Sequence, residues 1–406
     1  MSAVAQALDG VKIVEFGGYA AGPHIGKILA NYGATVVHVE SRERPDGFRL
    51  QYPPFKDGMP GIDRGGCFAF FNDSKYGITL NLKRSAGVTL ARRLVAWGDV
   101  VIENMRPGVM ARLGLGYESL RTGHSDLIML STCNMGQTGP RADTPGFGSQ
   151  LTALAGFCGL TGEPDGSPML LYGPYIDFIG SALGTVAVLA ALDRRHRTGC
   201  GSYIDLSQYE CGLTFLAGAL LDYEISGHVA ERAGNRDPDA APHGAYLCRA
   251  GRWLALSCWS DAEFAALMRA IGRPALAADP RFAGLAARQD HRAALDAALA
   301  AWCWTQDADE AAILLQHAGV AVHPVNTISD LFDDLQLRHR RTWRTRRHPV
   351  IGDQAYHFPG FELSRTPGDV TAPAPLLGAD NATVFQQFLK LDAAELEALR
   401  REDAID

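Results

Sequence analysis

Asp177 is the carboxylate whose place in the sequence best suits a nucleophile. It ends the extended run LLYGPYID and precedes an apolar stretch that predicts a helix over residues 178–197. At that point it could be the N-cap of the helix, because an N-cap side chain accepts hydrogen bonds from the first free N–H groups. A helix N-terminus also favours the ionised carboxylate and places N–H donors beside it, as a nucleophile requires. The sequence leaves both roles open for Asp177.

A second set of polar residues, ENMRPG at 103–108, stands where a predicted strand ends and a helix begins. Open α/β sheets bind their ligands at this position. Asn104 and Met105, together with Arg112 on the following helix, therefore suit a nucleotide site. The alternative is that the arginine is a solvated surface group.

The elements that must position these residues alternate between strands and helices. Apolar strands are predicted at 11–16, 35–40, 78–83, 99–104 and 127–132, with helices at 21–33 and 85–98. This alternation predicts a parallel sheet covered by helices. The first turn contains Gly17, Gly18 and Gly22, but no register gives G-x-G-x-x-G, so a nicotinamide dinucleotide is not expected. The start of that helix can still hold an anion or a nucleotide edge.

The second half of the chain has a different organisation. Helices are predicted at 178–197 and 206–225, and the Gly-, Pro- and Asp-rich stretch that follows indicates a linker or long loop. Two strand-like segments and two Ala-rich amphipathic stretches then predict a smaller α/β unit that ends near residue 325. The arginine cluster at 338–347 has one interleaved aromatic residue, Trp343, in an acidic chain. We interpret it as a solvated or interface surface rather than a nucleic-acid patch.

Composition limits the classes of ligand and location. The 406 residues carry 38 Lys and Arg against 45 Asp and Glu, and this net charge of −7 argues against a general nucleic-acid or anionic-membrane binder. A polyanionic ligand must find a local basic pocket. The eight cysteines include no CxxC pair and the N-terminus resembles no signal peptide, so we expect a cytoplasmic protein. The apolar run 179–192 is shorter than the roughly 20 residues that a bilayer demands, which favours a buried helix. Motifs for zinc, ATP or a serine triad are absent, so we expect no metal and no permanently bound cofactor.

The order and spacing of these pieces resemble the family III CoA transferases, which include formyl-CoA and carnitine-CoA transferases and are related to the α-methylacyl-CoA racemases. The resemblance spans nearly the whole chain and rests on LDGVKIVEFGGYAAGPHIGKILANYGATVVHVE, NDSKYGITLNLK, VIENMRPGVMARLGLGYESL and GPYIDFIGSALGTVAVLAALDRRHRTGCGSYIDLSQYE. It implies a Rossmann-like large domain with a parallel sheet and a smaller α/β domain, in ring-like chains that form an interlocked dimer. The large domain would comprise residues 1–225 and a return segment at 328–406, with the linker and small domain at 226–327.

The resemblance also implies a reaction. Asp177 would attack an acyl-CoA thioester to give an acyl-aspartyl anhydride and then an aspartyl-CoA thioester, from which CoA passes to a carboxylic acid acceptor. Coenzyme A is a substrate in this reaction. Lys83 and Arg112 would supply the local positive charge that the CoA phosphates need, and Arg42 would serve a phosphate. Motif matching places the CoA contacts on Ala20, Arg42, Leu80, Lys83, Asn104, Met105 and Arg112.

Three alternatives remain open beside a homodimeric transferase. The racemases add a histidine in a Gly-His-Asp stretch, which here is Gly146-Phe147-Gly148, so one acid/base partner is missing and we expect a transferase rather than a racemase or isomerase. A structural subunit paired with an active paralogue is the non-enzymatic alternative, and a heteromer is the alternative to a homodimer. A glycine-rich loop of formyl-CoA transferase is absent, which argues against oxalate and formate. The candidates for the acyl pocket, whose aromatic character suggests a bulky or aromatic acyl group, are Phe147, Tyr172, Tyr175, Phe178 and His243.

Overall fold

The computed structural model describes residues 5–405, which fold into two compact units. The first unit contains residues 5–158, 170–228 and 336–405, and the second contains 159–169 and 229–335.

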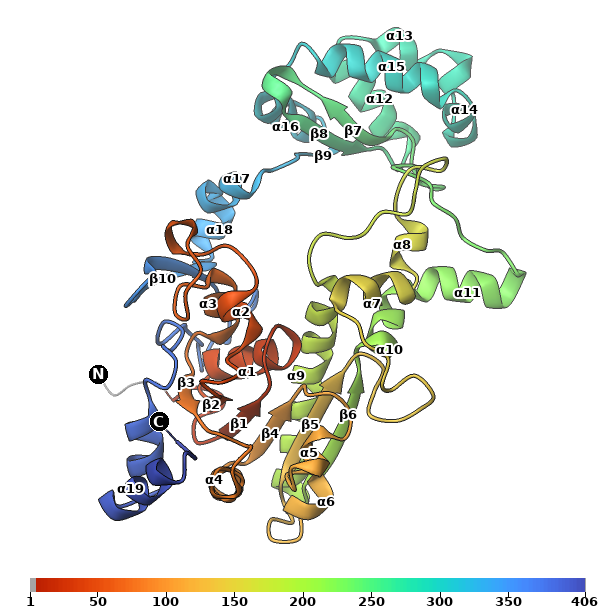
Figure 1. The fold of residues 1–406 in the computed structure, drawn as a ribbon. Coiled ribbons are helices and arrows are strands. Elements are labelled where there is room, and N and C mark those ends of the chain that lie inside the picture. The colour runs from red at the N-terminus through yellow and green to blue at the C-terminus, as the bar shows by residue number, and fades with distance from the viewer. Residues whose placement is uncertain (1–4, 406) are drawn as a thin grey trace. The chain divides into compact units, whose positions relative to one another are not determined.

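A six-stranded parallel sheet forms the centre of the first unit (Figure 1). Its strands stand in the order β3-β2-β1-β4-β5-β6, and every neighbouring pair is parallel. This is the strand order of a dinucleotide-binding Rossmann sheet, in which the order reverses between β1 and β4. The predicted α/β class with a parallel sheet is confirmed. The strands are β1 Lys12–Phe16, β2 Thr35–Glu40, β3 Tyr76–Thr79, β4 Val100–Glu103, β5 Ile128–Cys133 and β6 Ser202–Ser207.

Helices cover both faces of this sheet. On one face, α1 (Ala21–Asn31) and α9 (Tyr175–Thr198) bury Ile25 and Val188 against apolar strand residues such as Ile13. On the other face, α4 (Ser85–Trp97) and α19 (Ala393–Arg401) bury Leu94 and Leu396. Because side chains alternate along a strand, each apolar strand supplies both cores.

Helix α9 contains the apolar run for which the sequence predicts a buried helix, but it is longer than that run and only partly buried. It has 24 residues, is long and apolar enough to cross a membrane by length and composition alone, and has 44% of its apolar window buried. One side of α9 packs against α1, β5 and β6. These contacts are those of a helix that covers a sheet.

One strand was not predicted, and one predicted helix is divided. Strand β6 was not predicted, because Tyr203 and Asp205 alternate with less exposed residues and interrupt its apolar pattern at the sheet edge. The helix predicted over 206–225 is divided into α10 (Gln208–Leu213), a 3-10 turn at Thr214–Leu216 and α11 (Ala217–Ser226). Ser207 ends β6 and caps α10 by accepting from the Glu210 N–H, which fixes where strand changes to helix.

Short helices connect the strands of the first unit. In the N-terminal half they are α2 (Gly47–Leu50), α3 (Gly66–Asn72), α5 (Val109–Arg112) and α6 (Tyr117–Leu120), followed by α7 (Gly148–Leu154) and α8 (Phe157–Leu160). Helix α17 (Ile328–Asp333) lies in the second unit. Helix α18 (Leu335–His339) begins at the last residue of that unit and precedes an antiparallel hairpin of β10 (Trp343–His348) and β11 (Gly352–His357) in the first unit.

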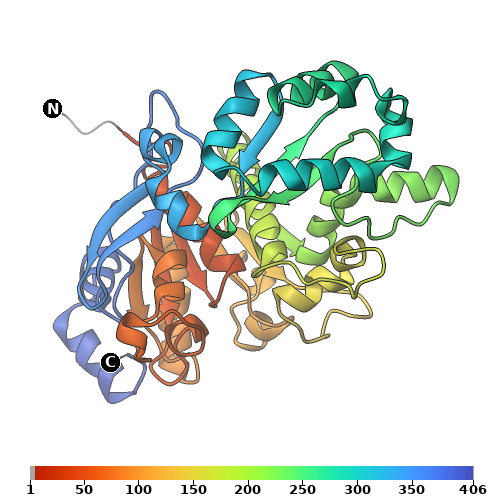
Figure 2. The same ribbon diagram turned by 90° about the horizontal axis from the view of Figure 1, so that it is seen from above.

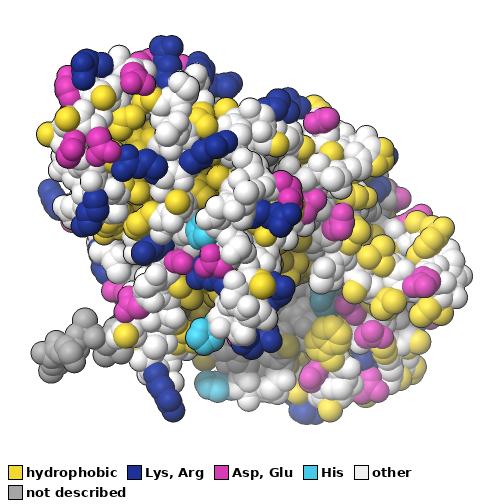
Figure 3. Space-filling view, turned by 90° about the horizontal axis from the view of Figure 1, so that it is seen from below, with side chains coloured by type: hydrophobic (Ala, Val, Ile, Leu, Met, Phe, Trp, Pro, Cys, Tyr) yellow, Lys and Arg dark blue, Asp and Glu magenta, His cyan; other side chains and the backbone are white. Residues whose placement is uncertain are grey.

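The arginine cluster contributes to this hairpin. Arg344 and Arg346 both pair with Asp369, and Arg347 pairs with Asp353, so carboxylates offset much of the local charge. Figure 3 shows one face of the molecule, on which Lys and Arg are interspersed with Asp and Glu.

The C-terminal segment returns to the N-terminal half of the first unit (Figure 2, blue beside red and orange). At the outer edge of β3, the Gly77 N–H donates to the Asp380 carboxylate at 2.8 Å and the Thr79 N–H donates to the Asn381 Oδ1 at 2.9 Å. The Arg49 guanidinium reaches the Pro375 carbonyl at 3.2 Å. Residues 375–381 therefore complete the first unit.

The second unit is a smaller α/β fold. Its antiparallel sheet has the order β7-β8-β9, with strands His243–Leu247, Trp253–Ser257 and Ala321–Pro324. The apolar sides of its helices meet this sheet in one core that includes Leu254, Leu267, Leu299 and Leu315. The helices are α12 Asp261–Ala270, α13 Pro274–Ala277, α14 Leu285–Asp290, α15 Arg292–Cys303 and α16 Ala308–His317.

Candidate active site

The turn between β1 and α1 lies at the point where the strand order reverses. Gly17 has a φ of +122°, and a Cβ there would lie 1.9 Å from the Asn104 Oδ1, so no other residue fits. The Asn104 amide binds Gly18 twice, accepting from its N–H at 3.0 Å and donating to its carbonyl at 2.7 Å. The end of β4 thereby fixes the turn after β1, in the crevice where sheets of this kind bind ligands.

The proposed CoA contacts lie along the carboxyl edge of four neighbouring strands. Leu80 and Lys83 follow β3, Arg42 follows β2, Ala20 follows β1, and Asn104 and Met105 follow β4, with Arg112 on α5. The structure thus brings together on one edge residues that are far apart in the sequence. The three basic side chains are exposed, whereas Ala20 and Leu80 are buried. Lys83 also pairs with Glu43 beside Arg42, which links the loops after β2 and β3.

Glu103 positions Met105 at this edge. The Met105 N–H donates to the Glu103 carboxylate at 2.8 Å, and the Glu103 side chain is buried at the end of β4. Burial raises the pKa of Glu103 to about 7, against the lowering effect of hydrogen bonds from Ser131 and Met105. No role was predicted for this carboxylate from the sequence.

Asp177 is not the N-cap of its helix, so the capping role is wrong. Helix α9 begins at Tyr175 with Pro174 as its cap, which puts Asp177 inside the first turn and frees its side chain. The carboxylate is only partly exposed. Burial raises its pKa from 3.8 to about 7, opposed by a hydrogen bond from the Gln208 side chain. Asp177 can therefore accept or release a proton near neutral pH.

Close packing surrounds this carboxylate. A Cβ on Gly148, the first residue of α7, would lie 2.2 Å from the Asp177 Oδ2. On the other side, the Gln208 Cγ would lie 3.1 Å from a Cβ on Gly180 of α9. The glycines allow α7 and α10 to approach the first turns of α9, which removes water from the carboxylate. The sequence signal for Gly148 and Gln208 was weak, since both act through contacts between distant segments.

Asp177 lies next to the start of α1. The Ser181 hydroxyl, one turn along α9, is 2.6 Å from the Asp177 carbonyl oxygen and 3.0 Å from the Ala21 carbonyl oxygen. The Phe178 ring contacts the His24 ring at 5.1 Å between centroids. The carboxylate and the edge that carries Ala20 and Asn104 are therefore parts of one region of the first unit.

The predicted acyl-pocket residues fall in different places. Phe147 caps α7 beside Gly148 and contacts Tyr19 at 6.0 Å between ring centroids, so it lies near Asp177. Tyr175 packs against Phe157 at 5.8 Å, whereas Tyr172 is fully exposed. His243 belongs to the second unit, where its Nδ1 is 2.8 Å from the Asn235 carbonyl oxygen.

Between residues 5 and 405, no three His, Cys, Asp or Glu side chains gather in a way that could hold a metal ion.

This chain is similar to known proteins in both sequence and fold. A sequence model described as CoA-transferase family III matches residues 8–381. A succinyl-CoA–D-citramalate CoA-transferase from Chloroflexus aurantiacus is 34% identical over 400 residues, which cover 97% of each chain. A succinyl-CoA–L-malate CoA-transferase alpha subunit from the same organism is 31% identical over 396 residues, covering 97% of this chain and 91% of the relative. Among solved structures, a CaiB/BaiF family protein from Brucella suis matches with a TM-score of 0.87 and 32% identity, over 95% of this chain and 100% of that chain.

Proposed function

Because this chain belongs to CoA-transferase family III, we propose that it moves CoA from an acyl-CoA donor to a carboxylic acid acceptor through Asp177. The carboxylate attacks the thioester carbonyl and expels CoA thiolate, which leaves an acyl-aspartyl anhydride. The thiolate then attacks the aspartyl carbonyl and releases the donor acid, which leaves an aspartyl-CoA thioester. The acceptor carboxylate attacks this thioester and expels CoA thiolate, which leaves an anhydride between Asp177 and the acceptor. The thiolate then attacks the acceptor's acyl carbonyl, forms the new acyl-CoA and releases the Asp177 carboxylate.

The observation that carries this proposal is the desolvated carboxylate of Asp177 beside the ligand edge of the sheet. Its pKa of about 7 leaves a large ionised fraction at neutral pH. Poor solvation makes that ionised form a better nucleophile, and each intermediate stays activated only while water is excluded. The close packing by Gly148 and Gln208 supports both requirements.

The exposed basic residues along the edge support CoA as the substrate. Arg42, Lys83 and Arg112 give positive charge to one side of an acidic chain, which suits the phosphates of CoA. CoA enters and leaves as a substrate, and the cycle requires no other cofactor.

The acids exchanged are proposed from the relatives. Both relatives described above are named for succinyl-CoA with a hydroxy-dicarboxylic acid, so succinyl-CoA with malate or citramalate is the first pair to test. A second set of assays tests aromatic and bulky acids as substrates, because Phe147 is an exposed aromatic side chain near Asp177. We place the reaction in the cytoplasm.

The chain is proposed to work as an interlocked homodimer. Apolar side chains remain exposed on α11, including Leu221 and Ile225, and on the outer side of α9 at Val186. Such surface is commonly covered by a partner chain. A heteromer is the alternative, because one relative is named an alpha subunit. Light scattering of the purified protein, alone and with a co-expressed paralogue, distinguishes the two assemblies.

The test of the chemistry is to trap the covalent intermediates. Wild-type protein incubated with an acyl-CoA donor and hydroxylamine or borohydride should give a modified peptide that contains Asp177. A screen of donors and acceptors by mass spectrometry should show CoA moving between acids. For the racemase alternative, a chiral 2-methylacyl-CoA in deuterated water should keep its α-proton. Rapid deuterium uptake without an acceptor acid would favour the racemase.

A further inference from the structure

Tyr19 adopts a backbone conformation that disfavours a tyrosine. Its φ is +63°, in the left-handed region that glycine occupies freely and residues with a side chain usually avoid. The residue lies in the turn between β1 and α1, directly before Ala20 and beside the Asn104 contact. Strain of this kind persists only where the surroundings impose it, and it concentrates at functional sites.

Residues 46–52, which we call the clamp, hold Tyr19 from three sides. The Tyr19 N–H donates to both carboxylate oxygens of Asp46, at 3.0 and 3.1 Å. The Tyr19 hydroxyl donates to the Gln51 Oε1 at 2.9 Å. The ring meets the Phe48 ring edge-on at 5.4 Å between centroids.

Two glycines provide the space for these contacts of Tyr19 and Asp46. A Cβ on Gly47 would lie 2.3 Å from the Tyr19 ring, and a Cβ on Gly18 would lie 2.9 Å from the Asp46 carboxylate carbon. The ring and the carboxylate therefore approach the backbone more closely than a larger residue would permit.

Asp46 is itself firmly held and almost fully buried. Its carboxylate caps α2 by accepting from the Phe48 N–H at 2.8 Å, and its own N–H donates to the Glu40 carboxylate at 2.8 Å. Glu40 in turn forms a two-pronged pair with the Arg49 guanidinium. The geometry of Asp46 thus depends on the end of β2 and on α2 together.

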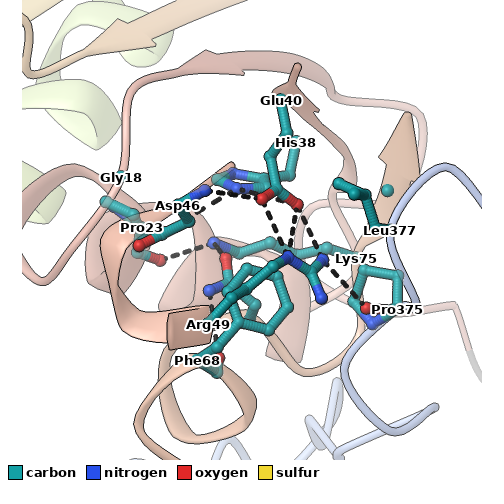
Figure 4. A network of polar contacts seen from close by, with 12 residues as sticks. Gly18, Pro23, His38, Glu40, Asp46, Arg49, Phe68, Lys75, Pro375 and Leu377 are labelled. Carbon is teal, nitrogen blue, oxygen red and sulfur yellow. Dashed lines mark hydrogen bonds and ion pairs between the residues drawn. The ribbon is translucent and has the colours of Figure 1, made fainter. Parts of the chain in front are cut away.

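A buried ionic network surrounds Asp46 (Figure 4). His38 lies between the acids: its Nδ1 is 2.6 Å from the Glu15 carboxylate, and its Nε2 is 3.8 Å from Glu40 and 4.0 Å from Asp46. Lys75 pairs with Glu15 at 2.9 Å. The carboxylates of Glu15 and Glu40 are thus paired with the buried cations of Lys75 and Arg49, and Asp46 lies beside them.

We propose that Asp46 is a positioning residue for acyl-CoA, because it holds Tyr19 in the left-handed conformation that sets the turn leading to Ala20 and α1. The inference rests on the proposed function, since this turn carries one of the proposed CoA contacts. Asp46 acts through the turn and does not take part in the transfer chemistry at Asp177. Its loss should weaken acyl-CoA binding and leave the rate at saturation nearly unchanged.

The experiment compares Asp46→Asn with wild type and with Asp57→Asn, a control at an exposed aspartate in a nearby loop. For Asp46→Asn we expect at least a tenfold rise in KM for acyl-CoA, less than a threefold change in kcat, and at least tenfold faster amide exchange in a peptide containing Tyr19. The control should match wild type. If Asp46→Asn does not fold, Asp46→Ser replaces it, because serine still caps α2 but cannot hold Tyr19 with two oxygens.

A double variant separates the clamp from other effects. Glycine takes a positive φ without help, so adding Asp46→Asn to Tyr19→Gly should change KM by less than about threefold. A full tenfold effect in the glycine background, or a folded Asp46→Asn protein with wild-type KM and exchange, would overturn the inference. If the wild type itself binds no CoA, the proposed function fails. If the wild type binds CoA and Asp46→Asn binds equally well, only the role of Asp46 fails.

Discussion

Replacing Asp177 by asparagine should stabilise the protein while it abolishes transfer. Asparagine has nearly the same shape as aspartate and keeps an acceptor for Gln208, but it never carries the negative charge. In the wild type that charge is held in a poorly solvated place, which is why the pKa of Asp177 is raised from 3.8 to about 7. In the wild type, the ionised carboxylate lowers the free energy of unfolding because it is poorly solvated in the folded state. The variant should lack this destabilisation.

The pKa of Asp177 determines how much stability the variant gains and how that gain depends on pH. Between pH 4 and 7 the folded wild type binds more protons at Asp177 than the unfolded chain does, so its stability falls as the pH rises. Below pH 4, Asp177 is protonated in both the folded and the unfolded chain, and the destabilisation of the wild type disappears. Above pH 7, this destabilisation is constant. A difference of about 3 pKa units, at 1.36 kcal/mol each, gives at most about 4 kcal/mol.

The assay is urea unfolding of wild type and Asp177→Asn at pH 4, 5, 6, 7 and 8, at one protein concentration because an oligomer's stability depends on it. The free energy of unfolding of the variant should equal that of wild type at pH 4 and exceed it by a few kcal/mol at pH 8. Asp193→Asn, at an exposed position of the same helix, is the matched control and should show no such trend. Transfer by Asp177→Asn should fall by several orders of magnitude. A variant less stable than wild type at pH 8, or a difference independent of pH, would refute the desolvated carboxylate.

Three further changes test the surroundings of the site. Gly148→Ala should lower kcat by at least tenfold with the fold intact, because the new Cβ would lie 2.2 Å from the Asp177 Oδ2; an unchanged kcat would show that the carboxylate has room to move. Gln208→Leu should move the acidic limb of the pH profile of kcat/KM to higher pH, because it removes the hydrogen bond that lowers the pKa of Asp177. An acidic limb at the wild-type pH would show that Gln208 does not stabilise the ionised carboxylate. Arg112→Ala should weaken binding of free CoA by about 1.5–3 kcal/mol in titration calorimetry, the value of a charged hydrogen bond, and equal affinity would remove Arg112 from the site.

The alternation of apolar strands and helices was enough to predict the parallel sheet of the first unit. Strands β1 and β2 and helix α1 lie close to their predicted ranges, because each has an uninterrupted apolar pattern. Strand order is a different matter, since local periodicity does not specify which strands become neighbours. Strand β6 was missed for a related reason: Tyr203 and Asp205 stand at a sheet edge where polar residues are tolerated.

The candidate site was only partly visible in the sequence. Asp177 was identified, but its role as an N-cap was wrong because the helix begins at Tyr175, which periodicity does not define to the residue. Phe147 was predicted as a pocket residue, but Gly148 and Gln208 were given no role around the carboxylate. Gly148 meets Asp177 across 29 positions of the chain, and Lys75 meets Glu15 across 60, so these contacts exist only in the folded structure.

The contact between β3 and the C-terminal segment has a consequence for synthesis. The outer edge of β3 is satisfied by Asp380 and Asn381, about 300 residues after the strand itself. At 5–20 residues per second, a ribosome needs roughly 15–60 s to make that stretch. Throughout this interval the N–H groups of Gly77 and Thr79 lack their final partners, and an open strand edge can pair with another nascent chain. Crowded polysomes are therefore where this protein is most exposed to misassembly, and a chaperone that covers the β3 edge would protect it there.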